Sequence, residues 1–191
     1  MIFYRDIDLA HECWMYQRPK RISNNSLSKI DEYLSRQKLS DAHVVGEDDD
    51  SKFRSTKICW MCDDFEEIRS VYEEICLSVR EINDNIWKYN LDGFESFQYG
   101  EYRSEEGGHY KWHIDTPARS NEDVRKITFV LGLNDDYEGG MFETMTFNTT
   151  SIKIKRGELI AIPSFILHRV TPVTKGIRKT LVGWGRGPNF I

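Results

Sequence analysis

The sequence places His113-Ile114-Asp115 ahead of His168 and Arg178, and these residues decide how its fold and chemistry are interpreted. Side chains alternate along a β-strand, so His113 and Asp115 are predicted to project from one face. With His168 from a distant strand, two imidazoles and one carboxylate would form a facial metal site with open positions, typical of non-haem Fe(II). Arg178 is a permanent cation suited to a bidentate salt bridge with a carboxylate. The sequence therefore predicts a metal site beside an anion site.

The composition is that of a globular protein in water. The chain has 191 residues, enough for one domain whose core needs no disulfide or structural metal. A net charge of −5 disfavours general binding to nucleic-acid phosphates, although residues 18–21 form a local basic patch. The first residues lack the order of a secretory signal, and no apolar run approaches the roughly 18 residues of a membrane span. We expect a cytoplasmic protein with no nucleic-acid or membrane partner, and the oligomeric state stays open.

The four cysteines are predicted to be free thiols in a reducing compartment: Cys13, Cys59, Cys62 and Cys76. Cys59 and Cys62 have the spacing of a zinc knuckle. No second pair of cysteines or histidines follows at the usual interval, so ordinary half-buried thiols on a strand are favoured over a metal or redox role.

A first amphipathic helix is predicted over residues 25–39. Leu27, Ile30 and Leu34 recur at spacings of three to four and form an apolar stripe. Three residues offer N-caps for this helix: Asn24, Asn25 and Ser26.

A strand and a longer helix follow. Residues 57–61 have the pattern of a strand, and residues 65–88 that of a helix capped by Asp63 or Asp64. Between the two helices, the acidic run at 47–50 is interpreted as a solvated loop, because clustered like charges repel one another.

After Gly93 the pattern changes to short β-rich segments separated by glycine and Asn-Asp turns. The predicted strands are 94–102, 109–115, 125–134, 140–147, 151–155, 158–162, 166–171 and 178–186. This pattern predicts an α+β, mostly β fold: a double-stranded β-helix, or cupin-like jelly roll, with supporting N-terminal helices. We expect a single domain over 1–191, with helical support and edge strands in 1–92 and a jelly-roll catalytic core in 93–191.

Several stretches of the C-terminal half resemble the 2-oxoglutarate/Fe(II) dioxygenases of the prolyl 4-hydroxylase type. They are residues 97–102, 107–115, 126–134, 137–143 and 168–184. The run from His168 to Trp184 is the most specific of them. The N-terminal half resembles the family only in the general order of its elements.

The resemblance implies an enzyme that couples oxidative decarboxylation of 2-oxoglutarate to succinate with hydroxylation of a C–H bond. His113, Asp115 and His168 would hold Fe(II), while 2-oxoglutarate and O₂ would take the open positions. Arg178 would pair with the distal carboxylate of 2-oxoglutarate, in keeping with the cost of burying an unpaired guanidinium. These four are the predicted catalytic residues, and ascorbate is an expected accessory cofactor.

Further residues are predicted to surround the co-substrate and the substrate. Tyr102 resembles a tyrosine that hydrogen-bonds near the co-substrate, although residues 103–106 lengthen the segment that follows it. Thr128 is placed to donate its hydroxyl to the co-substrate carboxylate. The predicted substrate-contacting residues are Tyr110, Trp112 and Trp184. For the first two, core packing is an equal alternative.

Three functions remain open on the sequence. The leading one is hydroxylation of prolyl residues in a peptide or protein, and the second is the same chemistry on a free amino acid or small metabolite. A non-oxygenase metal-binding jelly roll is the third, since zinc accepts the same ligands. Arg178 argues against it, because a zinc hydrolase does not need a buried cation there. A nucleic-acid demethylase is disfavoured, because Trp184 stands where those proteins have a second arginine.

Overall fold

The computed structural model describes residues 15–18, 22–42, 50–62, 66–116 and 123–189. Several predicted features lie outside these ranges: the caps Asp63 and Asp64, Cys13, and most of the runs at 47–50 and 18–21. In the part of the chain that is described, no helix is long and apolar enough to span a membrane.

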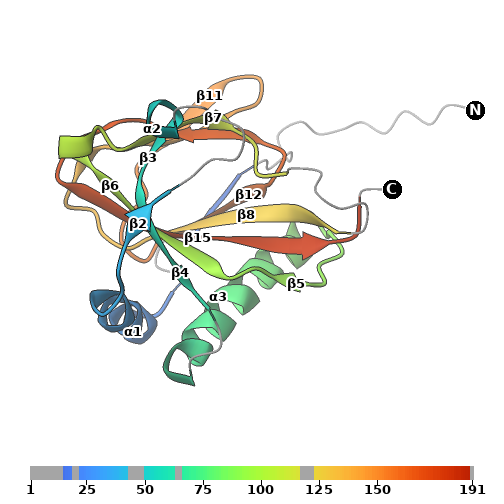
Figure 1. The fold of residues 1–191 in the computed structure, drawn as a ribbon. Coiled ribbons are helices and arrows are strands. Elements are labelled where there is room, and N and C mark those ends of the chain that lie inside the picture. The colour runs from blue at the N-terminus through green and yellow to red at the C-terminus, as the bar shows by residue number, and fades with distance from the viewer. Residues whose placement is uncertain (1–14, 19–21, 43–49, 63–65, 117–122, 190–191) are drawn as a thin grey trace, which may run out of the picture.

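A large antiparallel sheet forms the base of the fold (Figure 1). Its strands, in spatial order, are β1 (Tyr16–Arg18), β12 (Leu159–Pro163), β8 (Val124–Gly132), β15 (Ile177–Gly187), β6 (Phe97–Arg103), β4 (Lys57–Met61) and β2 (Ser40–Asp41), with β5 (Gly93–Phe94) paired to β15. β4 has the predicted bounds, whereas β1, β2 and the separation of β5 from β6 were not predicted.

A smaller sheet faces the large one. Its strands, in spatial order, are β11 (Thr149–Ile152), β10 (Phe142–Met145), β13 (Leu167–Val170), β7 (His109–His113) and β3 (Arg54–Ser55). Two short strands, β9 (Glu138–Gly139) and β14 (Val173–Lys175), pair separately, and the short helix α2 (Asp50–Phe53) precedes β3. The two facing antiparallel sheets are the predicted jelly roll.

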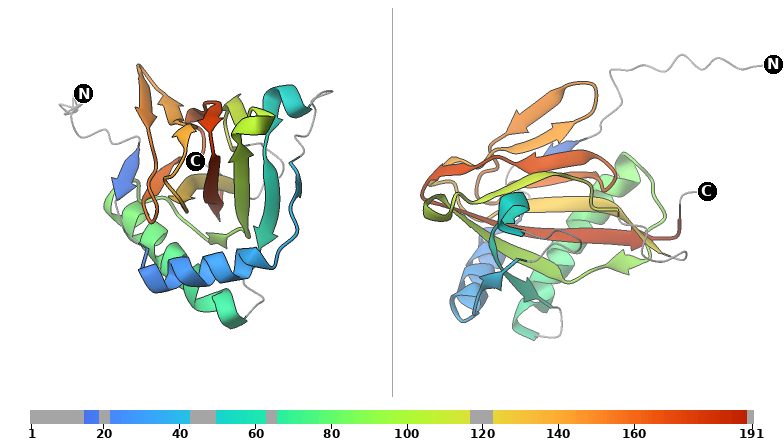
Figure 2. Two further views of the ribbon diagram at one scale, coloured as in Figure 1. Left: turned by 90° about the vertical axis from the view of Figure 1, so that its left-hand side faces the viewer. Right: turned by 45° about the horizontal axis from the view of Figure 1, so that its top comes forward.

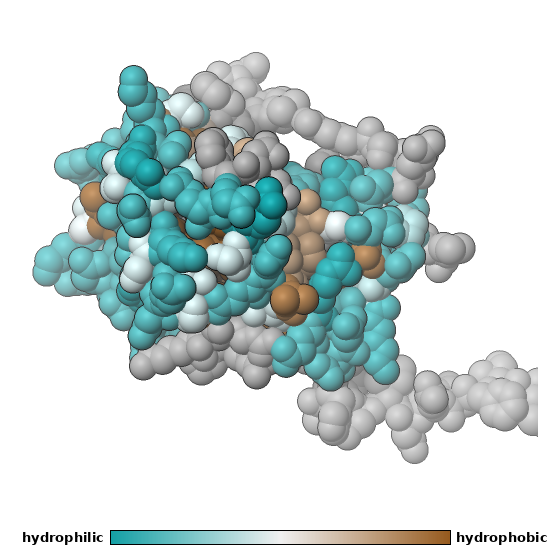
Figure 3. All heavy atoms as spheres, turned by 90° about the horizontal axis from the view of Figure 1, so that it is seen from below, coloured by the Kyte–Doolittle hydropathy of each residue, from teal (hydrophilic) through white to brown (hydrophobic). Residues whose placement is uncertain are grey.

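Helices α1 (Asn24–Ser35) and α3 (Glu66–Asn85) lie together under the large sheet, as the left view of Figure 2 shows. Their apolar faces share one core with alternate residues of the sheet, among them Phe129 and Leu131 of β8. Thr128 and Val130 alternate with these two residues along β8. They point instead into the interior of the roll and line its cavity. The side of the helices away from the sheet is mostly hydrophilic, with scattered hydrophobic residues (Figure 3).

The N-terminus of α1 differs from the prediction. Ser23 is the N-cap, in an extended conformation, and its hydroxyl accepts a hydrogen bond from the Ser26 N–H. The caps proposed at Asn24, Asn25 and Ser26 were therefore wrong. Glu74 of α3 explains the choice, because its carboxylate accepts hydrogen bonds from both the N–H and the hydroxyl of Ser23. This is a tertiary contact that the local sequence does not reveal.

Both long helices end earlier than predicted. α1 stops at Ser35, where the Arg36 N–H bonds back to carbonyls of the last turn. α3 stops at Asn85, because the Asn83 side chain binds both the N–H and the carbonyl of Tyr89 and so fixes the chain in a turn. Lys88 within that turn has a positive φ of 56°, which a helix cannot contain.

Candidate active site

The smaller sheet assembles the predicted metal ligands. β7 and β13 are antiparallel neighbours, and their register sets His113 directly opposite His168. Asp115 lies two residues beyond the end of β7, where its N–H donates to the Ser164 carbonyl at 2.9 Å. One ligand atom from each of the three residues lies within 4.8 Å of the others. The structure thus brings the three together, although Asp115 follows the strand instead of lying on it as predicted.

A backbone carbonyl orients each imidazole. Nδ1 of His113 lies 2.7 Å from the Lys111 carbonyl oxygen, and Nδ1 of His168 lies 2.8 Å from that of Ile166. A carbonyl only accepts, so Nδ1 carries the hydrogen and Nε2 of the neutral ring keeps a lone pair. The Nε2 atoms face Asp115 oxygens at 3.6 Å for His113 and 3.4 Å for His168. Two such nitrogens and one carboxylate fit Fe(II) or a similar divalent ion.

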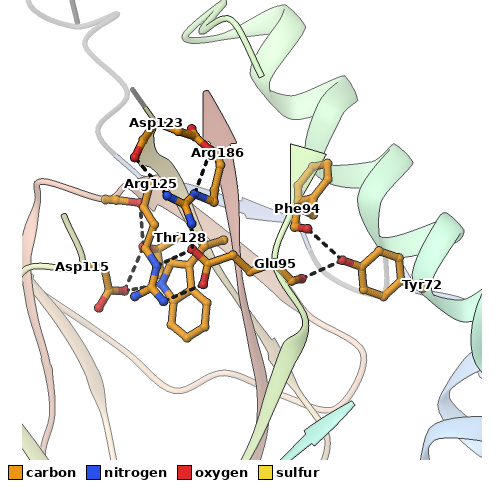
Figure 4. Close-up of polar contacts among 10 residues, drawn as sticks. Tyr72, Phe94, Glu95, Asp115, Asp123, Arg125, Thr128 and Arg186 are labelled. Carbon is orange, nitrogen blue, oxygen red and sulfur yellow. Dashed lines mark hydrogen bonds and ion pairs between the residues drawn. The ribbon is translucent and has the colours of Figure 1, made fainter. Parts of the chain in front are cut away.

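The buried carboxylate of Asp115 is itself hydrogen-bonded. Its Oδ2 accepts from the Thr128 hydroxyl at 2.9 Å and from Nε1 of Trp184 at 2.9 Å. Figure 4 shows Thr128 and Asp115 pointing toward each other. The Thr128 hydroxyl also lies 3.0 Å from the Ser164 hydroxyl. These contacts direct the Thr128 hydroxyl at the metal cluster, whereas the sequence suggested a donor to the co-substrate.

The cluster perturbs the pKa of each member. Burial, together with the neighbouring His168, lowers the pKa of His113 to about 4. Burial disfavours the charged forms of both Asp115 and His168, but the attraction between these two opposite charges outweighs it. This attraction holds the pKa of the Asp115 carboxyl well below its usual range and raises the pKa of His168. Without a metal, His168 therefore retains a proton at pH values where an exposed histidine has lost it.

The proton that His168 retains determines how metal affinity should depend on pH. A metal at Nε2 of His168 must displace it, so affinity should fall as the pH drops through the raised pKa, by about tenfold per unit for one displaced proton. The decline should begin above the ordinary histidine value of about 6.5. Co(II) titrations at a series of pH values would measure it. Affinity that stays constant between about pH 6 and pH 8 would contradict the expectation.

Arg178 lies in the same interior and is almost completely buried, with 1% of its surface exposed. Its Nη1 lies 3.4 Å from the Thr180 hydroxyl, and its guanidinium stands 5.0 Å from the centre of the Tyr102 ring. Nε and Nη2 are buried without a hydrogen-bond partner in the described structure. Buried, unpaired donors on a permanent cation are costly, so this site fits a carboxylate ligand.

Gly140 makes room for this arginine. It has a φ of +57°, and a Cβ on it would lie 2.9 Å from Cδ of Arg178. Tyr102 pairs with Arg178 in the β6–β15 register. The extra residues after Tyr102 are taken up by a 3₁₀ turn at Ser104–Glu106, so they do not shift its register.

A cavity of about 700 Å³ contains both groups. Its lining includes the three residues of the metal cluster, Arg178, Tyr102, Thr128 and Trp184, as well as Tyr110. The Tyr110 ring stacks on His113 with centroids 3.6 Å apart. The structure therefore gathers all but one of the predicted site residues around a single cavity.

Trp112 is the exception. It adjoins His113 on β7 and projects from the opposite face, as strand alternation requires. A β-bulge changes this alternation only between His113 and Tyr110. Val170 pairs with Tyr110 and His168 with His113, so β7 has one more residue than β13 between these pairs. Tyr110 and His113 consequently face the same side. Trp112 does not line the cavity, and the Arg169 guanidinium stands 4.6 Å from its ring centre. The substrate contact predicted for Trp112 is therefore not at this cavity.

Charged residues that were not predicted complete the cavity. Arg125 donates two hydrogen bonds to Glu95, at 2.8 and 2.6 Å, and Arg186 forms an ion pair with Asp123 (Figure 4). Arg54 on β3 donates to Gln98 and lies over the Tyr110 ring. In the sequence, these residues differed from other charged residues only in standing near the ends of apolar strands.

The C-terminal half of the chain is similar to known oxygenases. Residues 97–186 match the profile of the 2OG-Fe(II) oxygenase superfamily. A PKHD-type hydroxylase of Hyphomonas neptunium is 44% identical over 87 residues, which are 42% of this chain and 39% of that protein. A PKHD-type hydroxylase of Synechococcus sp. (strain CC9902) is 41% identical over 88 residues, 43% of this chain and 38% of that protein. The chain thus covers about two fifths of the length of these relatives.

Solved structures share the fold over nearly the whole chain. A prolyl-4-hydroxylase from Pseudomonas putida superposes with a TM-score of 0.74 at 19% identity, covering 92% of this chain and 94% of its own. A viral collagen prolyl hydroxylase from Paramecium Bursaria Chlorella virus-1, solved as its 2OG complex, gives 0.71 at 18% identity, with coverages of 94% and 99%. The likeness confirms the predicted fold class.

Proposed function

We propose that this chain is an Fe(II)- and 2-oxoglutarate-dependent hydroxylase, in keeping with the match of residues 97–186 to the profile of the 2OG-Fe(II) oxygenase superfamily. One observation carries the proposal. The His113–Asp115–His168 cluster shares its cavity with a buried Arg178 whose Nε and Nη2 have no partner in the part of the chain that is described. A metal cluster alone fits many functions, but a metal cluster with an unpaired cation suits a ligand that has a chelating end and a second carboxylate.

Each residue would have a defined task. Nε2 of His113, Nε2 of His168 and the Asp115 carboxylate would hold Fe(II), which when bound with 2-oxoglutarate and O₂ supplies the oxidising chemistry. Arg178 would receive the distal carboxylate of 2-oxoglutarate in a bidentate pair. Tyr102, buried beside it, would close that end of the cavity to water.

The proposed substrate is a prolyl residue in a peptide or protein. Tyr110 and Trp184 line the cavity with aromatic surface, and Trp60, with 45% of its surface exposed, stands beside Trp184. Flat aromatic surfaces suit the apolar face of a pyrrolidine ring, and proline-rich segments lose little entropy on binding because they are already extended. The titles of the structural neighbours, which name prolyl hydroxylases, agree with this class of substrate.

A free amino acid or small metabolite is the second candidate. The arginines Arg54, Arg125 and Arg186 line the same cavity and suit a substrate carboxylate. A hydrolytic or purely metal-binding role is disfavoured, because it leaves Arg178 without a function.

Further parts of the proposal have narrower support. Ascorbate as accessory reductant follows from the resemblance alone. A cytoplasmic location agrees with the free thiols of Cys59 and Cys62. In our proposal residues 1–92 support the catalytic core of residues 93–191 within one domain, because α1 and α3 share the core of the large sheet.

Mass spectrometry would test the substrate. Proline-containing peptides incubated with the protein, Fe(II), ascorbate and 2-oxoglutarate should gain one oxygen atom on proline, with succinate formed in equal amount. Reactions without 2-oxoglutarate, or with His168→Ala protein, are the matched controls. Turnover of 2-oxoglutarate stimulated only by a small metabolite would overturn the prolyl assignment and favour the second candidate.

A further inference from the structure

The two oxygens of Asp115 have different surroundings. Oδ2 accepts hydrogen bonds from Thr128 and Trp184, both at 2.9 Å, and faces Nε2 of His168 at 3.4 Å. Oδ1 has no donor among the described residues and faces Nε2 of His113 at 3.6 Å. Both donors are buried, Thr128 with 1% and Trp184 with 6% of its surface exposed. The carboxylate therefore cannot rotate without breaking two hydrogen bonds that water is poorly placed to replace.

Trp184 is held in turn by a cation from the neighbouring strand. The Arg125 guanidinium lies 3.8 Å from the centre of the Trp184 ring, and Glu95 fixes it with two hydrogen bonds. A cation over an indole face is attracted by the ring's quadrupole and limits its movement. The Glu95 N–H also donates to the Trp184 carbonyl at 3.0 Å.

The backbone of Glu95 is held by a residue of helix α3 that does not line the cavity. Its carbonyl accepts a hydrogen bond of 2.6 Å from the Tyr72 hydroxyl on α3, and Figure 4 shows Tyr72 reaching it from the helix. A continuous series of contacts therefore runs from the supporting helix through Glu95, Arg125 and Trp184 to Asp115.

We propose that Trp184 is a positioning residue that, together with Thr128, holds Oδ2 of Asp115 so that Oδ1 is presented to the metal. We further propose that Arg125 and Glu95 act on the metal only through Trp184. This inference rests on the proposed function, because it assumes that Asp115 is a metal ligand. Outer-shell partners of metal ligands typically contribute about 10–100-fold to metal affinity, which sets the expected size of the effect.

Metal binding provides a readout that does not depend on turnover. Co(II) can be titrated into the metal-free protein, with affinity and visible absorption spectrum recorded for each variant. Trp184→Phe keeps the aromatic ring and loses the N–H, and Thr128→Val keeps the shape and loses the hydroxyl. Each should weaken Co(II) binding by about 10–100-fold and alter the spectrum, because the carboxylate changes its coordination. Thr128→Ser retains the hydroxyl and should restore both.

Trp60→Phe is the matched control. Trp60 lines the same cavity, 6.2 Å from the Trp184 ring, and no hydrogen bond joins it to Asp115 in the described structure. Its Co(II) affinity and spectrum should equal those of wild type. Thermal unfolding of each metal-free variant separates a loss of positioning from a loss of fold.

The role of Glu95 and Arg125 in holding Trp184 is tested by combining variants. Glu95→Gln should weaken Co(II) binding in the wild-type background and have no effect in the Trp184→Phe background, where no N–H remains to be positioned. An equal effect in both backgrounds would show that Glu95 acts by another route and would overturn the second part of the proposal.

The outcomes also separate this inference from the proposed function. If wild type binds Co(II) and turns over 2-oxoglutarate while Trp184→Phe and Thr128→Val bind Co(II) as tightly, the positioning role is wrong and the proposed function stands. If wild type binds no divalent metal, both are wrong.

Discussion

Replacing His168 with alanine is expected to abolish tight metal binding and all turnover while leaving the fold intact. His168 supplies one of only three protein ligand atoms in the cluster, and its Nδ1 is already bonded to the Ile166 carbonyl. A site with two protein ligands left cannot compete with water for Fe(II). His113→Ala and Asp115→Ala should have the same effect, since each also removes one ligand. Titration with Fe(II), Mn(II) or Co(II) would measure the loss, and wild type should bind one equivalent.

His109→Ala is the control for this experiment. His109 lies on β7 with His113, but its ring nitrogens lie 2.8 Å from the Gly107 carbonyl and 3.3 Å from the Lys52 carbonyl, and it does not line the cavity. Its metal affinity should match that of wild type. Undiminished metal binding by His168→Ala would show that the cluster is not the metal site, provided that its thermal unfolding shows a folded protein.

Replacing Arg178 with alanine is expected to raise the 2-oxoglutarate requirement steeply. The distal carboxylate would be left unpaired in a buried pocket, at a cost of about 3–5 kcal/mol, or about 10²–10³-fold in affinity. Arg178→Lys should be milder, because the charge survives while the bidentate geometry is lost. Affinity can be measured by titrating 2-oxoglutarate into protein loaded with Mn(II).

Thermal unfolding gives a second measurement of the same interaction. At about 100 times its Kd, a ligand that binds only the folded state stabilises it by about 2.7 kcal/mol. 2-Oxoglutarate should therefore protect wild type but not Arg178→Ala. Lys179→Ala removes the adjacent cation, which does not line this cavity, and should behave like wild type. Equal 2-oxoglutarate affinity in wild type and Arg178→Ala would place the anion site elsewhere.

A sequence can reveal ionisable residues whose burial costs free energy unless a ligand or a partner satisfies them. His113, Asp115, His168 and Arg178 belong to this class. An arginine on a predicted strand that also contains Ile177, Leu181 and Val182 needs an anion if it is buried. The structure buries Arg178 with two nitrogens that have no partner among the described residues. The jelly roll followed from strand periodicity and turns alone, because these patterns are local.

What the sequence could not supply depends on distant partners. Ser23 caps α1 because Glu74, far along the chain, binds it. The bulge in β7 depends on its pairing with β13, and it brings Tyr110 to the same face as His113, while Trp112 lies on the opposite face. The Glu95–Arg125 pair joins the link between β5 and β6 to strand β8, 30 residues further along the chain. None of these leaves a periodic pattern.

Strand β15 carries both Arg178 and Trp184, six positions apart on the same face. It pairs with β6 from Ile177 to Val182 and with β8 from Thr180 to Gly187, and a slip of one residue would turn both side chains out of the cavity. The separation between the two ends of the pocket is therefore set by a central strand and not by loops. Insertions and substitutions in the surrounding loops can therefore alter which substrates enter, while the length of co-substrate that fits stays the same.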